Sequence, residues 1–293
     1  MPPSEVDVSA ELVRELLAEQ HADLAGLPLT ELSSGWDNTM FQLGDDLLVR
    51  LPRRSAAAQL IGNEQRWLPA LAPRLPLPIP TPVRVGRAGL GYPWTWSVVP
   101  LLPGQPAVHG PLADLAAAAD LLGRFLGALH RPAPPDHPPN PVRGVPLAAR
   151  DAATAARTAD LGPAIDGAAV TRCWREAVAV PPWPNEPVWL HGDLHPANIL
   201  VQHGRLSAII DFGDITGGDP ATDLAAAWML LPAGEHSGLR AGYAATNGAP
   251  IDDDTWARGR GWALALSLAY LAHSADNPTM AGIGRQTLQA VLR

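Results

Sequence analysis

The chain has 293 residues, of which 47% are apolar, and a formal net charge of -8. This length leaves room for one large or two modest domains, and no apolar run is long enough to cross a bilayer, so we expect no membrane partner. The acidic balance argues against a nucleic-acid partner and mildly favours a cationic small molecule.

The first residues lack the basic and then apolar segment of a secretion signal, so we expect a cytoplasmic protein. The single cysteine, Cys173, permits no internal disulfide and fits the same location.

The first third of the chain is rich in β-forming residues punctuated by proline and glycine. Strands are predicted at 29–32, 39–43, 47–52, 81–85 and 94–101. A helix is predicted at 56–71, and Ser33, Ser34, Gly35 and Asn38 lie in a turn between the first two strands.

Beyond residue 104 the apolar period becomes helical. Helical segments are expected at 112–130, 148–179, 221–231 and 256–273, and a short apolar strand at 188–190. The stretch 131–146 contains seven prolines. It must therefore be irregular, and we expect an exposed loop that borders the substrate site.

The run from 191 to 213 reads HGDLHPANILVQHGRLSAIIDFG. His191, Asp193 and Asn198 have the spacing of a kinase catalytic loop, and Asp211-Phe212-Gly213 has the form of a metal-binding loop. Transfer of a γ-phosphoryl group needs one carboxylate at the acceptor hydroxyl and oxygen ligands for magnesium. Asp193 is suited to the first role and Asn198 and Asp211 to the second.

Two short strands, 198–201 and 206–210, are predicted between these motifs. They turn at His203 and Gly204, which predicts a hairpin that brings Asn198 and Asp211 to the same end. An alternative interpretation takes His191, Asp193 and His195 as zinc ligands of a hydrolase. It leaves Asn198 and Asp211 unexplained.

Further motifs follow closely. Gly218-Asp219-Pro220 and Asp223-Leu224-Ala225 come directly after the metal loop, and the chain has no Ala-Pro-Glu tripeptide that would end a protein-kinase activation segment. With the motifs at 191–198 and 210–214, this order resembles the aminoglycoside phosphotransferase family of small-molecule kinases. The resemblance extends from about residue 29 to the C-terminus.

The resemblance implies an α+β, two-lobed, protein-kinase-like fold. Residues 1–103 would form a small N-lobe with an antiparallel sheet that binds nucleotide. Residues 104–293 would form a mainly helical C-lobe with the catalytic loop and the substrate-binding helices.

The chain has no lysine: all 21 basic residues are arginine. Kinase-like folds usually hold the α and β phosphates with a lysine on the third strand, and Arg50 stands where the family pattern would place it. Arginine keeps the charge but is not equivalent to lysine. Glu64, in the predicted helix 56–71, would be its ion-pair partner.

Two further segments are candidates for nucleotide binding, although the first could also be an ordinary hairpin turn and the second a plain turn between elements. The turn with Ser33, Ser34, Gly35 and Asn38 would offer amides and hydroxyls to phosphate oxygens. Residues 98–104 would be the hinge, where backbone groups near Val99 and Leu101 meet the adenine edge.

Four residues would support the catalytic loop. His191 and Asp223 are expected to brace it, while His195 and Asp219 could have structural or catalytic roles. Asp252, Asp253 and Asp254 begin the helix predicted at 256–273. They are interpreted first as helix-starting residues and second as a carboxylate cluster for a cationic substrate.

These features predict transfer of the γ-phosphate of ATP, or of GTP, to a hydroxyl of a small molecule with Mg²⁺ as cofactor. The resemblance implies an antibiotic acceptor of the aminoglycoside, macrolide or peptide type. A metabolic kinase for a sugar, amino alcohol or choline-like compound is the alternative. A nucleotide-binding protein without transfer activity is less favoured, because Asp193 and Asp211 are both present.

Overall fold

The computed structural model describes residues 3–34 and 37–293. The chain divides into two compact units. Unit 1 contains the described residues of Met1–Pro73, Pro78–Pro103 and Ile209–Gly213, and unit 2 contains Arg74–Leu77, Gly104–Ala208 and Asp214–Arg293.

Unit 1 is built on a five-stranded sheet with the order β1-β2-β3-β5-β4. Neighbouring strands pair antiparallel throughout. The strands are β1 (Leu29–Ser34), β2 (Asn38–Leu43), β3 (Leu47–Pro52), β4 (Arg84–Gly86) and β5 (Trp96–Pro100). The helices of this unit are α1 (Ala10–Gln20) and α2 (Ser55–Leu71).

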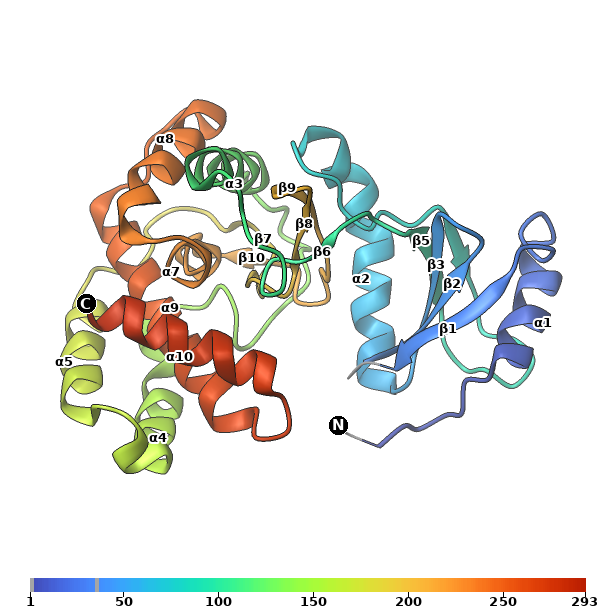
Figure 1. Ribbon diagram of the computed structural model, residues 1–293, viewed down its shortest axis with the longest axis horizontal. Helices are drawn as coiled ribbons and strands as arrows, with labels where there is room; N and C mark the ends of the chain where they lie inside the picture. The colour runs from blue at the N-terminus through green and yellow to red at the C-terminus, as the bar shows by residue number, and fades with distance from the viewer. Residues whose placement is uncertain (1–2, 35–36) are drawn as a thin grey trace. The chain divides into compact units, whose positions relative to one another are not determined.

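The two helices cover opposite faces of this sheet, because side chains alternate between faces along a strand. On one face, Val49 and Val98 pack with the buried residues of α1 in one apolar cluster. On the other face, Arg50 contacts Glu64 of α2, and Ser97 accepts a hydrogen bond from Gln65. Figure 1 shows the sheet between α1 and α2.

Unit 2 is mainly helical. Its helices are α3 (Leu115–Leu129), α4 (Asp151–Leu161), α5 (Gly167–Val178), α6 (Ala221–Leu224), α7 (Ala226–Leu230), α8 (His236–Asn247), α9 (Asp253–His273) and α10 (Pro278–Leu292). Its strands are β6 (Gln105–Pro106), β7 (Val188–Leu190), β8 (Ile199–Gln202) and β10 (Thr216–Gly218), and β9 (Arg205–Ile209) ends where the chain enters unit 1. They form the small sheets β10-β7 and β6-β8-β9.

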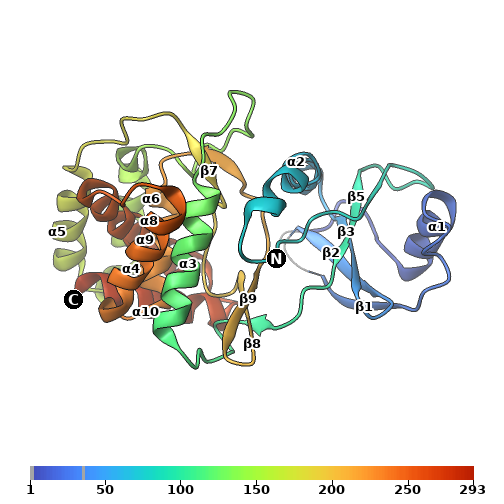
Figure 2. The same cartoon turned by 90° about the horizontal axis from the view of Figure 1, so that it is seen from above.

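Helix α9 is the central element of unit 2. It contacts α4, α5, α6, α7 and α10, and it is buried along most of its length. Helices α3 and α8 form a separate close pair, seen side by side in Figure 2. Glycines allow this approach, because a Cβ atom at Gly123 would overlap the carbonyl oxygen of Leu239.

The expected fold class, an antiparallel sheet followed by a mainly helical part, is confirmed. Some boundaries differ. Strand β4 begins at Arg84, because the prolines before it cannot donate ladder hydrogen bonds. The helical segment expected at 148–179 breaks into α4 and α5 around Pro163. Helices α1, α8 and α10 were not predicted individually.

None of the helices within the described residues has the length and apolar character needed to span a bilayer.

Replacing Gly123 by alanine tests the α3–α8 contact. Alanine is preferred over glycine inside a helix by about 1 kcal/mol. Here the added Cβ would overlap α8, so we expect the free energy of unfolding to fall by about 1–3 kcal/mol. Urea denaturation followed by circular dichroism measures this change.

The control is Gly282→Ala in α10, where an added Cβ would have no atom within 4 Å. This variant should be neutral or stabilised by up to about 1 kcal/mol. Equal effects of the two substitutions would contradict the close contact of α3 with α8.

Candidate active site

The catalytic loop lies between β7 and β8 in unit 2 and is held by Asp223. The two carboxylate oxygens of Asp223 accept hydrogen bonds from the backbone N–H groups of His191, at 2.8 Å, and Gly192, at 2.9 Å. His130, at the end of α3, approaches the same carboxylate with Nε2 at 3.2 Å. Asp223 therefore braces the loop, as the sequence predicts.

Gly192 is required by the shape of this loop. Its φ angle is 86°, and a Cβ atom would overlap the carbonyl oxygen of Asp214. Any other residue would push the loop away from Asp214.

Burial alone would raise the pKa of the Asp223 carboxyl. The hydrogen bond and charge of His130, together with His191 and the N–H of Gly192, lower this pKa by more than burial raises it. The pKa of Asp223 is therefore below its ordinary value, and the carboxylate is ionised at neutral pH.

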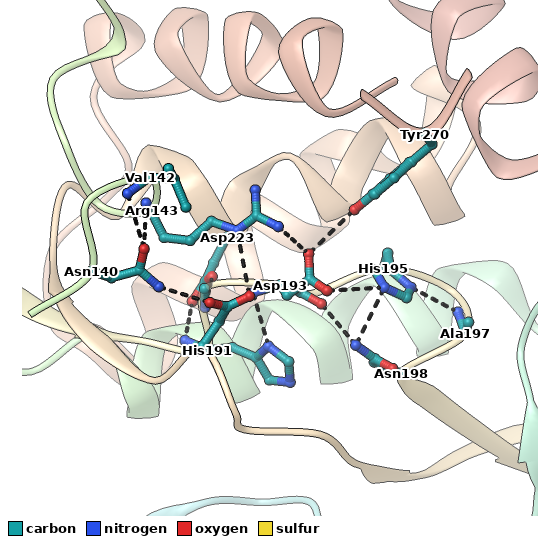
Figure 3. Close-up of polar contacts among 12 residues, drawn as sticks. Asn140, Val142, Arg143, His191, Asp193, His195, Ala197, Asn198, Asp223 and Tyr270 are labelled. Atoms are coloured by element: carbon teal, nitrogen blue, oxygen red, sulfur yellow. Dashed lines mark hydrogen bonds and ion pairs between the residues drawn. The ribbon is translucent and has the colours of Figure 1, made fainter. Parts of the chain in front are cut away.

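Among the described residues, the Asp193 carboxylate contacts the side chains of Arg143, Tyr270 and His195 (Figure 3). Its Oδ1 accepts a hydrogen bond from Arg143 Nη2 at 2.7 Å and one from the Tyr270 hydroxyl at 3.4 Å. His195 Nε2 lies 3.3 Å from Oδ2. Burial acts to raise the pKa of Asp193, but His195 and then Arg143 outweigh it, so the pKa is well below its ordinary value.

Both loop histidines use a ring nitrogen within the loop. His191 Nδ1 accepts the N–H of Asp193, and His195 Nδ1 accepts the N–H of Ala197, each at 3.2 Å. The proton of His195 then lies on Nε2, which faces Asp193. This geometry argues against a zinc site of His191, Asp193 and His195, and within residues 3–34 and 37–293 no group of three such side chains is arranged to hold a metal ion.

Asn198 presents an oxygen that fits a magnesium ligand. Its Nδ2 donates to the carbonyl of Asp193 at 3.0 Å, which fixes the orientation of the amide. Because His195 Nε2 carries its proton, the 3.3 Å approach of Asn198 Nδ2 to it is a contact between two donors. No hydrogen bond from the described residues occupies Oδ1, and magnesium prefers such oxygen ligands.

The hairpin between Asn198 and Asp211 turns where the sequence predicts. Strands β8 and β9 are neighbours in their sheet, and the turn residues His203 and Gly204 have φ angles of 51° and 74°. Positive φ at both positions is typical of a tight two-residue hairpin turn.

Asp211 follows β9 and belongs to unit 1. It has a φ angle of 63° and is exposed. A left-handed backbone conformation is uncommon at residues other than glycine. The residues that do adopt it are concentrated at functional sites.

Unit 1 also contains the ion pair of Arg50 and Glu64. Arg50 Nη1 donates to Glu64 Oε2 at 2.7 Å, and both side chains are buried. Burial acts to lower the pKa of Arg50, but the charges of Glu64 and Asp211 outweigh it, so the pKa of Arg50 is raised. The structure thus brings the expected cation and its expected partner together, near the carboxylate of Asp211.

Three of the residues expected in the phosphate turn lie in strands. Ser33 and Ser34 are in β1, and Asn38 is the first residue of β2. Gly35 lies outside the described residues. Within the described residues, Oδ1 of Asn38 is buried without a hydrogen-bond partner.

The predicted hinge residues are at the end of β5. Val99 pairs with Leu48 of β3, and the N–H of Leu101 donates to the carbonyl of Asp46 at 2.7 Å. Any contact of Leu101 with adenine would therefore use its carbonyl group.

Asp219 has a structural role. Its carboxylate accepts from Arg258 Nε at 2.7 Å and from the N–H of Ala221 at 3.0 Å. Asp219 and Arg258 are both buried, and the carboxylate oxygens of Asp219 are already used by these hydrogen bonds. This arrangement argues against Asp219 as a metal ligand.

The three consecutive acidic residues begin α9. Asp252 caps the helix by accepting the N–H and hydroxyl of Thr255, and Asp253 pairs with Arg240. Tyr270, which contacts Asp193, lies 17 residues beyond Asp253 on the same helix, or about 25 Å along its axis. This separation argues against the expectation that Asp252, Asp253 and Asp254 hold a small acceptor whose hydroxyl meets Asp193.

The sequence did not predict the roles of Arg143, Tyr270 and His130. The loop 131–146 is largely exposed or half-buried, as expected, and Pro138 is its one buried residue. The loop is also fastened to β10: the N–H of Gly217 donates to His137, and the hydroxyl of Thr216 donates to the carbonyl of Pro138. Arg143 could have been proposed from the sequence, because it lies in a loop that was already expected to border the substrate site. Tyr270 had no such signal, because its helix reads as core.

The antiparallel sheet, the helical unit and the braced loop with Asp193 and Asn198 define an enzyme of the kinase-like class. A model of the phosphotransferase enzyme family matches residues 28–262. The chain belongs to this family, and the resemblance found in the sequence is confirmed.

Solved structures show the same fold. The GDP complex of aminoglycoside 2'-phosphotransferase-IIIa has a TM-score of 0.69 at 18% identity, with 97% of this chain and 99% of that chain covered. The GDP and kanamycin complex of APH(2")-IIIa has a TM-score of 0.67 at 19% sequence identity, with 95% of this chain and 97% of that chain covered. The apoenzyme of macrolide 2'-phosphotransferase MphH from Brachybacterium faecium has a TM-score of 0.62 at 23% sequence identity, with 96% of this chain and 97% of that chain covered. No curated protein sequence matches the chain.

Asp223→Asn tests the brace of the catalytic loop. Asparagine keeps one acceptor oxygen where two N–H groups need one each, so we expect a loss of about 1–3 kcal/mol in the free energy of unfolding at pH 7. Because the folded-state pKa of Asp223 is lowered, this contribution is present in full above about pH 4 and is lost as the pH falls through the folded-state value.

The measurement is urea denaturation of wild type and variant from pH 7 to pH 3. The control is Asp120→Asn, which removes an exposed carboxylate that pairs with Arg124, and its effect should stay within about 0.5 kcal/mol. A stability difference for Asp223→Asn that does not shrink in acid would contradict the role of its ionised carboxylate.

Proposed function

We propose that this phosphotransferase moves the γ-phosphate of ATP or GTP to a hydroxyl of a small antibiotic. The observation that carries the proposal is the Asp193 carboxylate, ionised and held on a loop that Asp223 and Gly192 fix, with the free Oδ1 of Asn198 on the same loop.

Asp193 orients the acceptor hydroxyl and accepts its proton late in the transfer. The low pKa of Asp193 is compatible with this role, because the transition state is loose and needs orientation and charge neutralisation more than a strong base. His191 and His195 keep the loop and the carboxylate in position.

Arg50 binds the phosphates of the nucleotide, and Glu64 holds its guanidinium. Arginine donors match phosphate oxygens and keep their charge at any accessible pH. The remaining nucleotide contacts are assigned to Ser33, Ser34, Gly35 and Asn38 for phosphate and to Val99 and Leu101 for adenine, which makes residues 1–103 the nucleotide-binding part and 104–293 the catalytic part.

Asn198 and Asp211 are the proposed ligands of Mg²⁺. One amide oxygen and one exposed carboxylate fit a metal that keeps several waters and phosphate oxygens as ligands. When bound, magnesium neutralises charge on the phosphates.

The acceptor class rests on the related structures, one of which contains kanamycin and another of which is a macrolide phosphotransferase. The GDP complexes support a nucleoside triphosphate as the donor and keep GTP open beside ATP. A cytoplasmic location belongs to the same proposal, because nucleoside triphosphates are found there. A sugar, amino alcohol or choline-like acceptor is the alternative that the following experiment separates.

Purified protein should be stabilised by Mg²⁺ with ATP or GTP in a thermal-shift assay and should consume that nucleotide with an acceptor. The panel contains aminoglycosides, macrolides, peptide antibiotics, sugars and choline. Asp193→Asn should keep the thermal shift but lose transfer by about 10³-fold or more, because the acceptor hydroxyl loses its base.

An absent thermal shift with both nucleotides would refute the proposed function. Turnover of choline or sugars with no turnover of antibiotics would replace the antibiotic by a metabolite. Unchanged transfer by Asp193→Asn would show that another group serves as the base.

Arg50→Gln tests the phosphate contact. A charge-assisted hydrogen bond contributes about 1.5–3 kcal/mol, so the Kd for the magnesium nucleotide should rise by about tenfold or more, while Arg50→Lys should lose less. Titration calorimetry measures both. Arg84→Gln, which removes an exposed arginine of unit 1, is the control.

Glu64 stays buried in Arg50→Gln and could unfold the unit, so the double variant Arg50→Met/Glu64→Leu provides a folded comparison. Wild-type affinity in the single and the double variant would exclude Arg50 as a phosphate ligand.

A further inference from the structure

Arg143 contacts the Asp193 carboxylate, which is the group that the acceptor hydroxyl would approach. His195 Nε2 lies 3.3 Å from Oδ2 of this carboxylate, and Oδ1 accepts hydrogen bonds from both Arg143 and the Tyr270 hydroxyl. Arg143 Nη2 lies 2.7 Å from Oδ1 (Figure 3). A hydroxyl bound to this carboxylate, and the phosphoryl group that it attacks, would come within reach of the guanidinium.

The backbone of Arg143 is held firmly. The N–H groups of Val142 and Arg143 both donate to Oδ1 of Asn140, whose Nδ2 donates to Asp214 at 2.8 Å. Gly144, the next residue, donates to the Thr222 hydroxyl and accepts the N–H of Asp219. Arg143 is thus presented to Asp193 from a fixed loop, not from a mobile tail.

The guanidinium keeps donors available. Nη2 bonds Asp193, and Nε lies 3.7 Å from Asp214 without a hydrogen bond. No described residue accepts from Nη1. The side chains of Arg143 and Asp193 remain 16% and 26% exposed, so a ligand can reach both.

Two other arginines of unit 2, the buried Arg258 and the half-buried Arg131, hold parts of the fold together. Arg258 bonds Asp219 and the carbonyl of Pro181, and Arg131 bonds the last carbonyl groups of α8. Arg143 differs from them because its partner is the proposed catalytic base and because its donors are not all satisfied.

We propose that Arg143 is a catalytic residue that contacts the phosphoryl group during transfer and neutralises the charge on its equatorial oxygens. This inference rests on the proposed function of Asp193. An arginine supplied by the same chain has this effect in other phosphoryl-transfer enzymes. In a chain without lysine, it is the cation that the structure places at the base.

The acceptor oxygen forms a bond to the γ-phosphorus while the bond from that phosphorus to the β–γ bridging oxygen breaks. The bridging oxygen keeps the electron pair and leaves with the nucleoside diphosphate, and the hydroxyl proton passes to Asp193. Arg143 keeps its proton throughout, because its pKa is raised: burial acts to lower it, but Asp193 and other nearby groups outweigh burial.

The test compares wild type, Arg143→Gln and Arg143→Lys. Calorimetry measures the affinity for Mg²⁺ with ADP or GDP alone and with added aluminium fluoride, which mimics the transferring phosphoryl group. We expect Arg143→Gln to bind the diphosphate like wild type but to lose the tightening by aluminium fluoride. Its kcat should fall by about 10³-fold with little change in the KM for the acceptor, and Arg143→Lys should lose less.

Arg124→Gln is the matched control, because it removes an arginine that pairs with an aspartate on the exposed side of α3. It should keep both affinities and kcat. Arg143→Ala adds a readout that a structural role would not move: free guanidinium should restore part of its kcat, whereas Asp193→Asn should not respond.

The outcomes separate the two proposals. If wild type binds no magnesium nucleotide, the proposed function and this inference both fail. If wild type is tightened by aluminium fluoride and Arg143→Gln is tightened equally, only the role of Arg143 is refuted. A raised KM for the acceptor at unchanged kcat would also refute it, because Arg143 would then bind the acceptor instead of the phosphoryl group.

Discussion

The carboxylate of Asp223 is the contact on which the catalytic loop depends. It joins three segments that are far apart in the sequence: the short helix α6, the loop at His191 and Gly192, and the end of α3 at His130. A buried carboxylate is costly unless several donors satisfy it, and here two backbone N–H groups and an imidazole surround it. The direction of Asp193 follows from this arrangement.

A second layer of polar contacts supports the first. Asp219 lies just before α6, and its ion pair with Arg258 attaches this part of the chain to α9. The N–H of Asp219 also donates to the carbonyl of Gly144. The proline-rich loop is thereby tied to the elements that brace Asp193. Proline suits such a loop because it limits the conformations of the unfolded chain, while hydrogen bonds from the loop to β10 and Thr222 provide the folded contacts.

The absence of lysine gives arginine all of the cationic roles. Arg50 shows what this requires, since its larger guanidinium is buried and is matched by Glu64 at 2.7 Å. Arg143 faces Asp193 at the same distance of 2.7 Å but keeps partial exposure. A planar guanidinium offers several fixed donors, so one arginine can hold a carboxylate and still present donors to phosphate.

The sequence by itself determined the parts whose chemistry depends on local spacing. The loop from His191 to Asn198, the hairpin turn at His203 and Gly204 and the Asp211 loop all lie within 23 residues, where backbone geometry limits the possible arrangements. Arg50 and Glu64 could be paired because a strand and the following helix are close neighbours in the chain.

Only the tertiary structure decided which distant groups reach Asp193. Arg143 is 50 residues away from it in the sequence and Tyr270 is 77, and His130 is 93 residues from Asp223. No periodicity encodes such contacts, because they depend on how α3, α9 and the loop 131–146 pack. For the same reason Asp252 was open to two interpretations in the sequence, and its position at the distant end of α9 decided for the helix cap.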